Sequence, residues 1–318
     1  MTRVCFVVGH EDTPEAYWRV ALPARHLRAP MVLAGAQGAA ETALGTDALW
    51  IHQPTSLAAA DLAEKAIARG LVVIVDLSED PWSRHEIDGA YNEHRLGACD
   101  RALTAATLLV VTSQELADAL GADEARVIAP VAPLAESMEP TTPPALGWWS
   151  DGRQKSGWEK VAPELLKVLG STDATIRHLG YAHMRPLAGA RSEQGIAEYA
   201  ARQTVYMYQD NAAASCRLFQ GALAECVVSL DCYHAGQYRD TVSDLGILRA
   251  AAAGVPTVTT RDAAPPGAVS APPGEWAATI QGLIGEPGQR RALSLKARLW
   301  AASRTSFADY ESVLQEVA

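Results

Sequence analysis

The sequence predicts an α/β chain with two domains, each built on a parallel β-sheet that helices cover on both faces. Short, continuous apolar runs such as LVVIV (71–75) and LLVVT (108–112) recur along the chain. Such runs are typical of strands that are buried on both sides of a parallel sheet. Helical segments alternate with these runs as far as a proline-rich stretch, and the same alternation resumes after it. The renewed alternation indicates a second domain of the same class.

The first half is expected to alternate between strands and helices up to that stretch. Strands are expected at 4–8, 31–34, 48–52, 71–75, 107–112 and 126–129, and helices at 14–27, 56–68, 85–105 and 113–120. Ser56 and Ser113 stand at helix starts, where a serine side chain can cap free backbone N–H groups. Residues 131–144 (VAPLAESMEPTTPP) contain four prolines and no apolar periodicity, which is typical of a linker.

The second half repeats the alternation. Strands are expected at 145–149, 175–179, 203–208, 226–230 and 255–258, helices at 158–169, 212–224, 243–253, 274–284, 289–302 and 307–317, and a surface loop at 264–273. The predicted organisation is an N-terminal domain (1–135), a linker (136–144), a C-terminal domain (145–303) and a C-terminal helix (304–318) that is a candidate to pack on the N-terminal domain.

Composition and charge bound the function. The 318 residues are 48% hydrophobic, which suffices for two buried cores, and the net charge of −10 argues against unspecific binding to nucleic acid or to a membrane surface. The five cysteines are odd in number and lack metal-ligand spacing, so they are interpreted as free thiols in a reducing compartment. The chain opens directly with a strand and has no run of membrane-spanning length, so a soluble, cytoplasmic protein is expected.

The most informative stretch is DTVSDLGILRAAAAGVPTVTT (240–260). A short polar loop (231–240) follows the strand at 226–230, and Ser243 and Asp244 are then predicted to open a helix that Gly254 ends. The free N–H groups and the dipole at such a helix start favour an anion, and ligands of open α/β sheets lie at the carboxyl ends of the strands. The stretch therefore predicts a phosphate site. A plain strand–helix–strand unit with an ordinary cap remains the alternative.

Polar residues also follow two strands of the first half. Gly9 and His10 come after the first strand, where glycine lets a phosphate or sugar approach the backbone and histidine can serve as a general base. Asp76 ends the fourth strand and is the candidate carboxylate to orient or deprotonate a hydroxyl, or to stabilise an oxocarbenium-like centre. The alternative for His10 is an ordinary surface histidine.

Glu79 and Asp80 continue this acidic stretch. A capping role remains open for Asp80, because Pro81 follows it and proline favours the first position of a helix. The stretch lacks a partner cluster elsewhere in the sequence, so no metal site is expected.

Several stretches, in this order, carry a resemblance to a known family. They are AYWR (16–19), DALWIHQP (47–54), VVIVDLSEDPW (72–82), LLVVTSQELADAL (108–120), LGWW (146–149) with KSG (155–157), and LRAAAAGVPTV (248–258). Together they resemble glycosyltransferases of the GT-B architecture, most of all the retaining group 4-type enzymes and their bacteriophage-encoded relatives. The resemblance implies two Rossmann-like domains with an interdomain cleft for a nucleotide-sugar.

The resemblance also implies roles for particular residues. Asp76 and His10 would be catalytic. The donor would be bound by Ser243, Asp244, Lys155, Arg153, Arg239, Asp231, Tyr233, His234 and Gly9, and the acceptor by Tyr17, Arg19, Glu79 and Asp80. The cations among them would neutralise the diphosphate as the glycosidic bond breaks.

The chain departs from the family pattern at three positions. Arg249 stands where the family has a carboxylate, Thr241 where its partner carboxylate falls, and Trp148 where an arginine is usual. Trp148 and Trp149 either line the cleft or are buried beneath the linker. The departures keep open the alternative of a degenerate, non-catalytic protein that binds a nucleotide or a sugar.

The expected function is therefore the transfer of a hexosyl or pentosyl group from a UDP- or GDP-linked donor to an acceptor hydroxyl, without a metal or another cofactor. The resemblance implies a modified DNA base, a glycan or a protein as the acceptor, and the host cytoplasm as the location if the chain is phage-encoded. A dinucleotide enzyme is disfavoured because no GxGxxG follows the first strand. The oligomeric state stays open.

Overall fold

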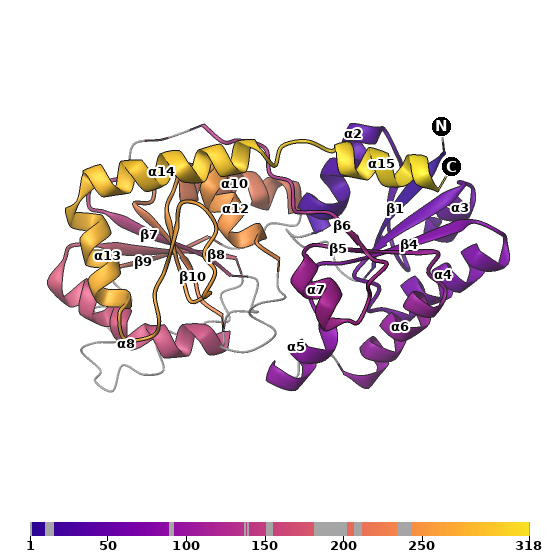
Figure 1. The fold of residues 1–318 in the computed structure, drawn as a ribbon, viewed down its shortest axis with the longest axis horizontal. Helices are drawn as coiled ribbons and strands as arrows, with labels where there is room; N and C mark the ends of the chain where they lie inside the picture. Colours follow the sequence, from indigo (N-terminus) through magenta and orange to yellow (C-terminus); the bar gives the residue numbers. More distant parts are fainter. Residues whose placement is uncertain are drawn as a thin grey trace. The chain divides into compact units, whose positions relative to one another are not determined.

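The computed structural model describes residues 2–9, 16–88, 92–136, 138, 140–150, 155–180, 202–206, 212–233 and 243–317. Its contacts divide the chain into two units (Figure 1). Unit 1 comprises Met1–Val131, Asp240–Ser243 and Ser306–Ala318, and unit 2 comprises Ala132–Arg239 and Asp244–Thr305. Each unit contains one six-stranded parallel sheet, so the prediction of two parallel α/β domains is confirmed.

Unit 1 alternates strands with helices along the chain. Its strands are β1 (Val4–Val8), β2 (Met31–Leu33), β3 (Ala48–His52), β4 (Val72–Leu77), β5 (Leu108–Val111) and β6 (Arg126–Val127). Its helices are η1 (Tyr17–Ala21), α2 (Leu22–Leu27), α3 (Ala39–Leu44), α4 (Leu57–Ala68), α5 (Pro81–Asp88), α6 (Glu93–Thr104), α7 (Gln114–Ala119) and α15 (Ala308–Glu316).

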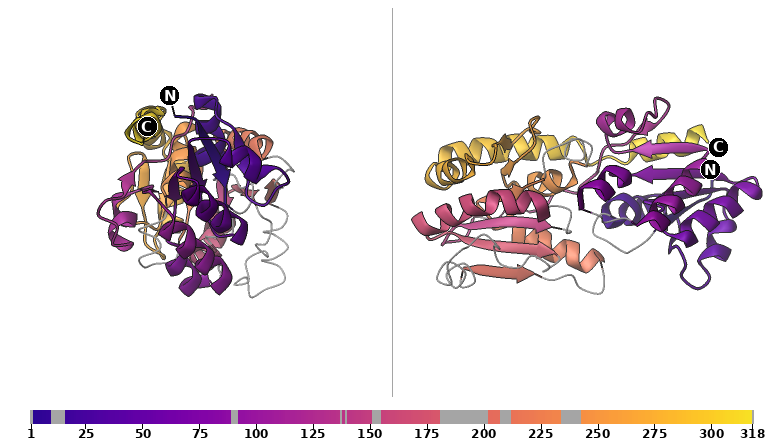
Figure 2. Two further views of the ribbon diagram at one scale, coloured as in Figure 1. Left: turned by 90° about the vertical axis from the view of Figure 1, so that its right-hand side faces the viewer. Right: turned by 90° about the horizontal axis from the view of Figure 1, so that it is seen from below.

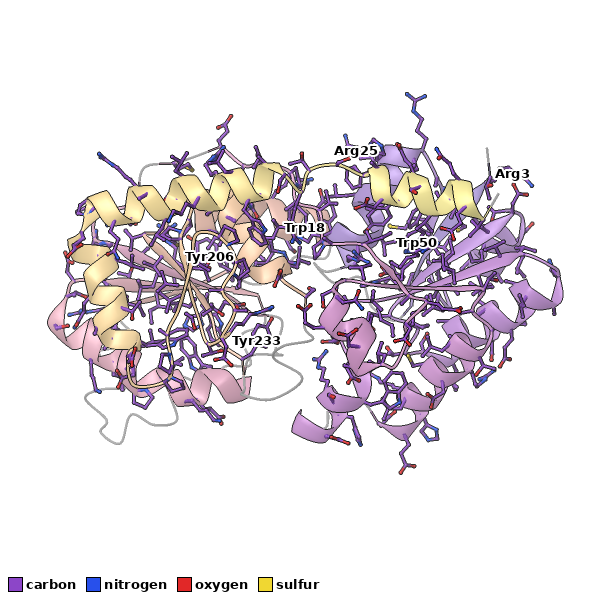
Figure 3. All side chains as sticks on the ribbon, in the orientation of Figure 1. Arg3, Trp18, Arg25, Trp50, Tyr206 and Tyr233 are labelled. Atoms are coloured by element: carbon purple, nitrogen blue, oxygen red, sulfur yellow. The ribbon has the colours of Figure 1, made fainter. Side chains whose placement is uncertain are left out.

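The strands of unit 1 bury side chains on both faces, as their continuous apolar runs predict. One set of alternate residues, including Cys5 and Val7 of β1, packs with α4, α6 and α7. The other set, including Phe6 of β1, packs with η1, α2 and α15. Trp50 of β3 stacks on Tyr310 of α15 at 5.0 Å between ring centroids, and it lies beside this helix in Figure 3. The C-terminal helix is therefore part of the core of unit 1.

The segment η1 is a π-helix, in which the N–H of Leu22 bonds to the carbonyl oxygen of Tyr17. Pro23 follows at the start of α2 and has no N–H to donate, which interrupts the regular helical ladder. Such wide turns inside helices often mark functional positions. The wide turn presents the fully buried Arg19 to the sheet.

Unit 2 has the same plan. Its strands are β7 (Ala145–Ser150), β8 (Thr175–Gly180), β9 (Gln203–Tyr206), β10 (Val228–Asp231), β11 (Thr257–Thr259) and β12 (Ala268–Ser270). Its helices are α8 (Lys155–Ser171), α10 (Ala212–Ala224), α12 (Leu245–Ala252), α13 (Trp276–Gly285) and α14 (Pro287–Ala302). One face of the sheet packs with α8 and α13, where Trp148 stacks on Trp158 at 3.7 Å between centroids. Figure 2 shows each sheet as one layer with helices on both sides.

The order of the strands fixes where a ligand site can form. The order in unit 1 is β2-β1-β3-β4-β5-β6, and in unit 2 it is β12-β11-β10-β7-β8-β9. Each order reverses direction once, between β1 and β3 in unit 1 and between β7 and β10 in unit 2. Ligands of open parallel sheets bind at the carboxyl ends of the strands next to such a switch point. The residues that follow these four strands are therefore the first candidates in each unit.

Three sequence-based assignments are wrong. A single helix was expected at 85–105, but α6 begins anew at Glu93 because the side chain of Asn92 caps it, accepting a hydrogen bond from the N–H of Arg95 at 3.0 Å. The expected loop 264–273 contains β12, which pairs with β11. Helix α3 was missed because its six residues are too few for a periodic pattern.

Gly9 allows β1 and β3 to end side by side. A Cβ atom at this position would lie 2.2 Å from the carbonyl oxygen of Gln53 and 2.5 Å from that of His52. The close approach that the sequence predicts is thus an approach to protein backbone, and the N–H of Gly9 donates to the His52 oxygen at 2.9 Å.

We predict that Gly9→Ala lowers the free energy of unfolding by about 2 kcal/mol or more, because neither backbone can yield without breaking the ladder. Gly97→Ala is the control, since nothing lies within 4 Å of a Cβ in that α6 position. The control should be neutral or up to about 1 kcal/mol more stable. Urea unfolding measures both, and equal stability of the two variants would contradict this account of Gly9.

Candidate functional site

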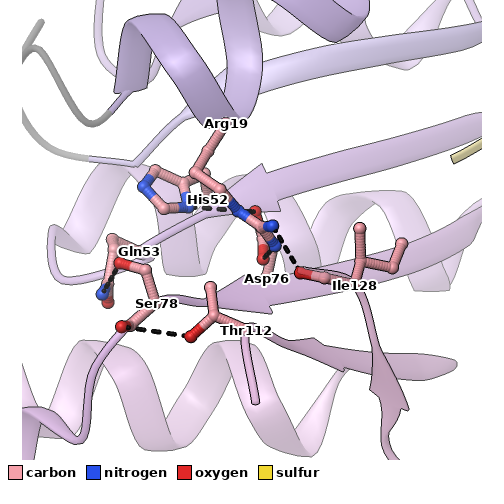
Figure 4. Close-up of polar contacts among 7 residues, drawn as sticks. All are labelled: Arg19, His52, Gln53, Asp76, Ser78, Thr112 and Ile128. Atoms are coloured by element: carbon pink, nitrogen blue, oxygen red, sulfur yellow. Dashed lines mark hydrogen bonds and ion pairs between the residues drawn. The ribbon is translucent and has the colours of Figure 1, made fainter. Parts of the chain in front are cut away.

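A buried ion network lies at the carboxyl edge of the sheet of unit 1 (Figure 4). Asp76, in β4, is fully buried and accepts a hydrogen bond from Arg19 Nε at 3.2 Å; its other oxygen pairs with Arg19 Nη2. His52 Nδ1, at the end of β3, lies 3.0 Å from Asp76 Oδ2. Arg19 Nη1 also donates to the carbonyl oxygen of Ile128 at 2.7 Å. The network therefore joins η1, β3, β4 and the segment after β6.

The network keeps Asp76 ionised. Burial alone would raise the pKa of this carboxyl group, but the charges of Arg19 and His52 and their hydrogen bonds outweigh burial and hold the pKa at about 2. A carboxylate with so low a proton affinity is poorly suited to remove a proton from a substrate. The geometry fits a positioning role for Asp76, in which it fixes the orientation of His52.

Sequence reasoning did not single out His52, which ends β3 beside the switch point. Among the described residues, the only hydrogen bond of its ring is the one to Asp76. If Nδ1 carries the proton that Asp76 accepts, Nε2 is left as an acceptor. Figure 4 shows this second nitrogen pointing away from Asp76. The detectable signal was a histidine that directly follows a buried apolar run, DALWIH (47–52).

The remaining candidates of unit 1, Asp80, Glu79 and Tyr17, contact other groups of the protein. Asp80 Oδ1 accepts from the N–H groups of Trp82 and Ser83 at 3.0 and 3.2 Å, so the capping alternative describes it. Glu79 is buried and pairs with Arg84 at 2.7 Å. Tyr17 is half-buried and meets Trp18 edge-on at 5.5 Å between centroids.

Some predicted residues lie outside the part of the chain that the structure describes. They are His10, Arg153, His234, Arg239 and Thr241. Lys155 is the first residue of α8 by its backbone. The glycine that follows it, Gly157, holds α8 close to the end of β10, because a Cβ there would lie 2.6 Å from the Cys232 oxygen.

A second charged cluster lies at the carboxyl ends of β10 and β11 in unit 2. Asp231 is buried, accepts from Thr259 Oγ1 at 2.9 Å and lies 3.3 Å from Arg261 Nε. Arg261 Nη1 donates to Asp244 at 2.8 Å. The Arg261 guanidinium also stands over the ring of Tyr233, 5.2 Å from its centroid. Asp231, Asp244 and Tyr233 of the predicted donor set thus come together, around an arginine that sequence reasoning missed.

The pKa directions in this cluster follow from burial and charge. Burial raises the pKa of Asp231, and the nearby Arg261 offsets this rise only in part. Burial by itself would lower the pKa of Arg261, but the charges of Asp231 and Asp244 raise it, so Arg261 stays protonated. With both carboxylates ionised, these three side chains carry one net negative charge.

The expected cap of α12 is wrong in detail. The N-cap residue is Asp244, whose side chain makes no capping hydrogen bond, and the helix begins at Leu245. Ser243 is buried in unit 1, where its N–H donates to the carbonyl oxygen of Ser78 at 3.1 Å. Asp231 Oδ1 lies 3.1 Å from the position that a Cβ of Gly246 would take. A carboxylate of the protein therefore already stands against the first turn of α12, where the helix dipole favours it.

Two of the three departures from the family pattern, Arg249 and Trp148, are buried in the core of unit 2. Arg249 is buried, and its guanidinium stands 4.3 Å from the centroid of the Trp149 ring. Trp148 is fully buried against Trp158. Burial, rather than the lining of a cleft, describes both tryptophans.

Within the described ranges, no three His, Cys, Asp or Glu side chains come together as a group that could hold a metal ion. No helix in the described part of the chain is both long and apolar enough to cross a bilayer.

No protein-family profile and no curated protein matches the sequence. Solved structures match it in fold. A glycosyltransferase from Rickettsia africae superposes with a TM-score of 0.62 at 10% identity, over 99% of this chain and 98% of that chain. The fold is that of the GT-B glycosyltransferases.

Two further structures share the GT-B fold. S. aureus TarM, in a complex with Fondaparinux, alpha-GlcNAc-glycerol and UDP, superposes with a TM-score of 0.58 at 10% identity over 85% of this chain, which spans only 55% of TarM. A Listeria monocytogenes protein assigned as a UDP-N-acetylglucosamine 2-epimerase gives 0.55 at 10% identity, over 100% of this chain and 98% of that one. The shared fold thus accommodates more than one reaction.

We predict that Asp76→Asn destabilises the protein by about 3 to 5 kcal/mol at neutral pH, because it leaves Arg19 buried without its counterion. The folded-state pKa of Asp76 lies below the unfolded value of about 3.9, so its stabilisation is present above pH 4 and is lost as the pH falls towards 2. The stability difference between wild type and variant should therefore shrink over this acidic range.

Asp47→Asn is the control. The pKa of Asp47 is also about 2, held down by hydrogen bonds from Arg3, but this pair is exposed, so its loss should change stability far less. Urea midpoints between neutral and acidic pH measure both variants. A wild-type midpoint in Asp76→Asn at neutral pH would contradict the role of the ion network.

Proposed function

We propose that the protein is a glycosyltransferase that moves a sugar from a nucleotide-sugar donor to an acceptor hydroxyl. The observation that carries the proposal is the presence of a buried, charged cluster beside the switch point of each sheet in a GT-B fold. These are the places where open parallel sheets bind ligands. The R. africae glycosyltransferase shares this fold over nearly the full length of both chains, which supports the same class of function.

The proposal assigns the hydroxyl-rich part of the donor to Asp231, Asp244 and Tyr233. Carboxylates accept hydrogen bonds from ribose or sugar hydroxyls, whereas a cluster with one net negative charge repels a diphosphate. The diphosphate is assigned instead to Lys155, Arg153 and Arg239 and to backbone N–H groups at helix starts, since a leaving diphosphate gains negative charge.

The proposal assigns His52 a contact to a substrate hydroxyl through Nε2, with Asp76 and Arg19 as positioning residues. A histidine of fixed tautomer beside an ionised carboxylate can accept a proton or a hydrogen bond at a defined point. His10 remains a second candidate for the same task.

The finer features of the proposal come from the sequence resemblance. They are a UDP- or GDP-linked donor, a hexosyl or pentosyl group, transfer without a metal ion, a modified DNA base, a glycan or a protein as the acceptor, and a bacteriophage origin with action in the host cytoplasm. The observation that favours the non-catalytic alternative is Arg249, which replaces a carboxylate and is packed on Trp149.

A nucleotide screen tests the proposal. The nucleoside diphosphate of the true donor, from UDP, GDP and ADP, should raise the melting temperature with concentration, because a ligand at a hundred times its Kd adds about 2.7 kcal/mol of stability. The matching nucleoside without phosphates is the control and should have a smaller effect. If no nucleotide or nucleotide-sugar shifts the transition, the proposal is wrong.

Product analysis separates the reaction classes. Release of the nucleoside diphosphate together with a glycosylated acceptor supports transfer. An epimerised sugar would assign the protein to the reaction of the Listeria relative, and binding without turnover would favour the degenerate alternative.

We predict that His52→Asn lowers the transfer rate by about a hundredfold or more while the nucleotide still binds, because it removes a positioned proton acceptor. His94→Asn is the control, since His94 is exposed at the start of α6. Transfer rates measured at saturating donor should fall in His52→Asn and not in His94→Asn. A wild-type transfer rate in His52→Asn would exclude the role of His52.

A further inference from the structure

Helix α14 carries positive charge in an acidic chain. Its sequence, PGQRRALSLKARLWAA (287–302), contains four basic residues and no acidic residue, whereas the whole chain has a net charge of −10. The helix packs against α12 and α13 through buried residues such as Ala297 and Ala301, so its opposite face points to solvent. In Figure 1 it runs along the outside of unit 2.

The solvent face of α14 is apolar along its middle. Leu295 and Leu299 are 62% and 64% exposed and stand one helical turn apart. The other residues in this row are small and exposed, namely Gly288, Ala292 and Ala302. Their spacing of three and four residues makes one continuous stripe, which we call the α14 stripe.

Basic side chains flank the α14 stripe. At 100° per residue, Arg291 falls on one side of the leucines and Lys296 on the other, and both are exposed. Within the described residues neither forms an ion pair. The other two basic residues of α14 form hydrogen bonds to the backbone. Arg290 donates to carbonyl oxygens at the end of α13, and Arg298 donates to the Ala135 oxygen at 3.1 Å.

The chain before β7 adds apolar surface next to the helix. Leu134 and Met138 are 44% and 46% exposed, and Met138 lines a hollow of about 160 Å³ together with Arg291 and Ser294 of α14. Three of the ten exposed large hydrophobic side chains in the described part of the chain, Leu295, Leu299 and Met138, thus lie on or beside α14. The exposed acid nearest to α14 in sequence is Glu286, which directly precedes the helix.

We propose that the α14 stripe docks on the surface of an anionic lipid bilayer. An apolar row between cationic flanks is the arrangement of helices that lie in a membrane interface, where leucines enter the headgroup region and lysine or arginine pairs with lipid phosphates. The acidic remainder of the chain does not prevent this, because exposed charges more than about 10 Å away are largely screened by salt.

Two other partners fit the stripe less well. A nucleic acid would use the cations but not two protruding leucines. A protein partner, including a second copy of this chain, would need a broader apolar centre, since stable interfaces bury about 800 Å² on each side. Docking of α14 on a bilayer does not depend on the proposed transferase activity.

Vesicle flotation of the full-length chain tests the proposal. The protein should float with vesicles of phosphatidylcholine and phosphatidylglycerol, float less as salt increases, and not float with phosphatidylcholine alone. Arg291→Glu combined with Lys296→Glu should weaken binding at least tenfold, and Leu295→Ser combined with Leu299→Ser should weaken it to a similar extent.

Matched controls lie on α4 of unit 1 and at Arg69, which caps its C-terminal end. Leu57 is 57% exposed, so Leu57→Ser removes a comparable surface leucine; Lys65→Glu with Arg69→Glu reverses two exposed cations. Both controls should bind vesicles like wild type. The proposal is overturned if wild type does not float with anionic vesicles, if the α14 variants bind as well as the controls, or if the leucine variant instead dissolves a dimer seen by light scattering.

Discussion

The buried pairing of Arg19 with Asp76 is the interaction on which unit 1 depends. Both side chains are taken fully out of water, which costs several kcal/mol for each ion unless close partners replace the solvent. The pair meets this condition with His52 and the Ile128 carbonyl as further partners. Because these partners come from separate elements, the pairing is satisfied only when η1, β3, β4 and the segment after β6 are all in place. We infer that it selects one arrangement of this edge rather than adding much net stability.

Each unit has a buried charged cluster beside the switch point of its sheet, but the two clusters differ in the charges they contain. The cluster in unit 1 gathers a cation, an anion and a histidine around Asp76, whereas the cluster in unit 2 sets two carboxylates against Arg261. The first suits the orientation of a proton-accepting group, and the second suits the binding of hydroxyl groups. In the proposed transfer reaction, these two tasks correspond to the acceptor hydroxyl and to the hydroxyl groups of the donor.

The strands were predictable because burial on both faces leaves an unmistakable run of apolar residues, as in VVIVDL of β4. Elements that are too short to show a pattern could not be predicted. An example is β12, which has three residues and lies between prolines. The apolar periodicity predicts one helix over 85–105, but the capping residue Asn92 starts a separate helix, α6. The ends of the predicted strands located the candidate site residues. The sequence did not reveal which other side chains these residues contact. The pairing of Arg19 with Asp76 spans 57 positions and depends on a π-helical turn that apolar periodicity does not reveal.

The nitrogen spectrum of the His52 imidazole tests the central claim most directly. If Asp76 is ionised and fixes this ring, long-range ¹⁵N NMR at neutral pH should show a protonated Nδ1, and Asp76→Asn should change the tautomer balance. A His52 ring in wild type with a bare Nδ1 and the proton on Nε2 would contradict the account, because Asp76 would then not be its acceptor.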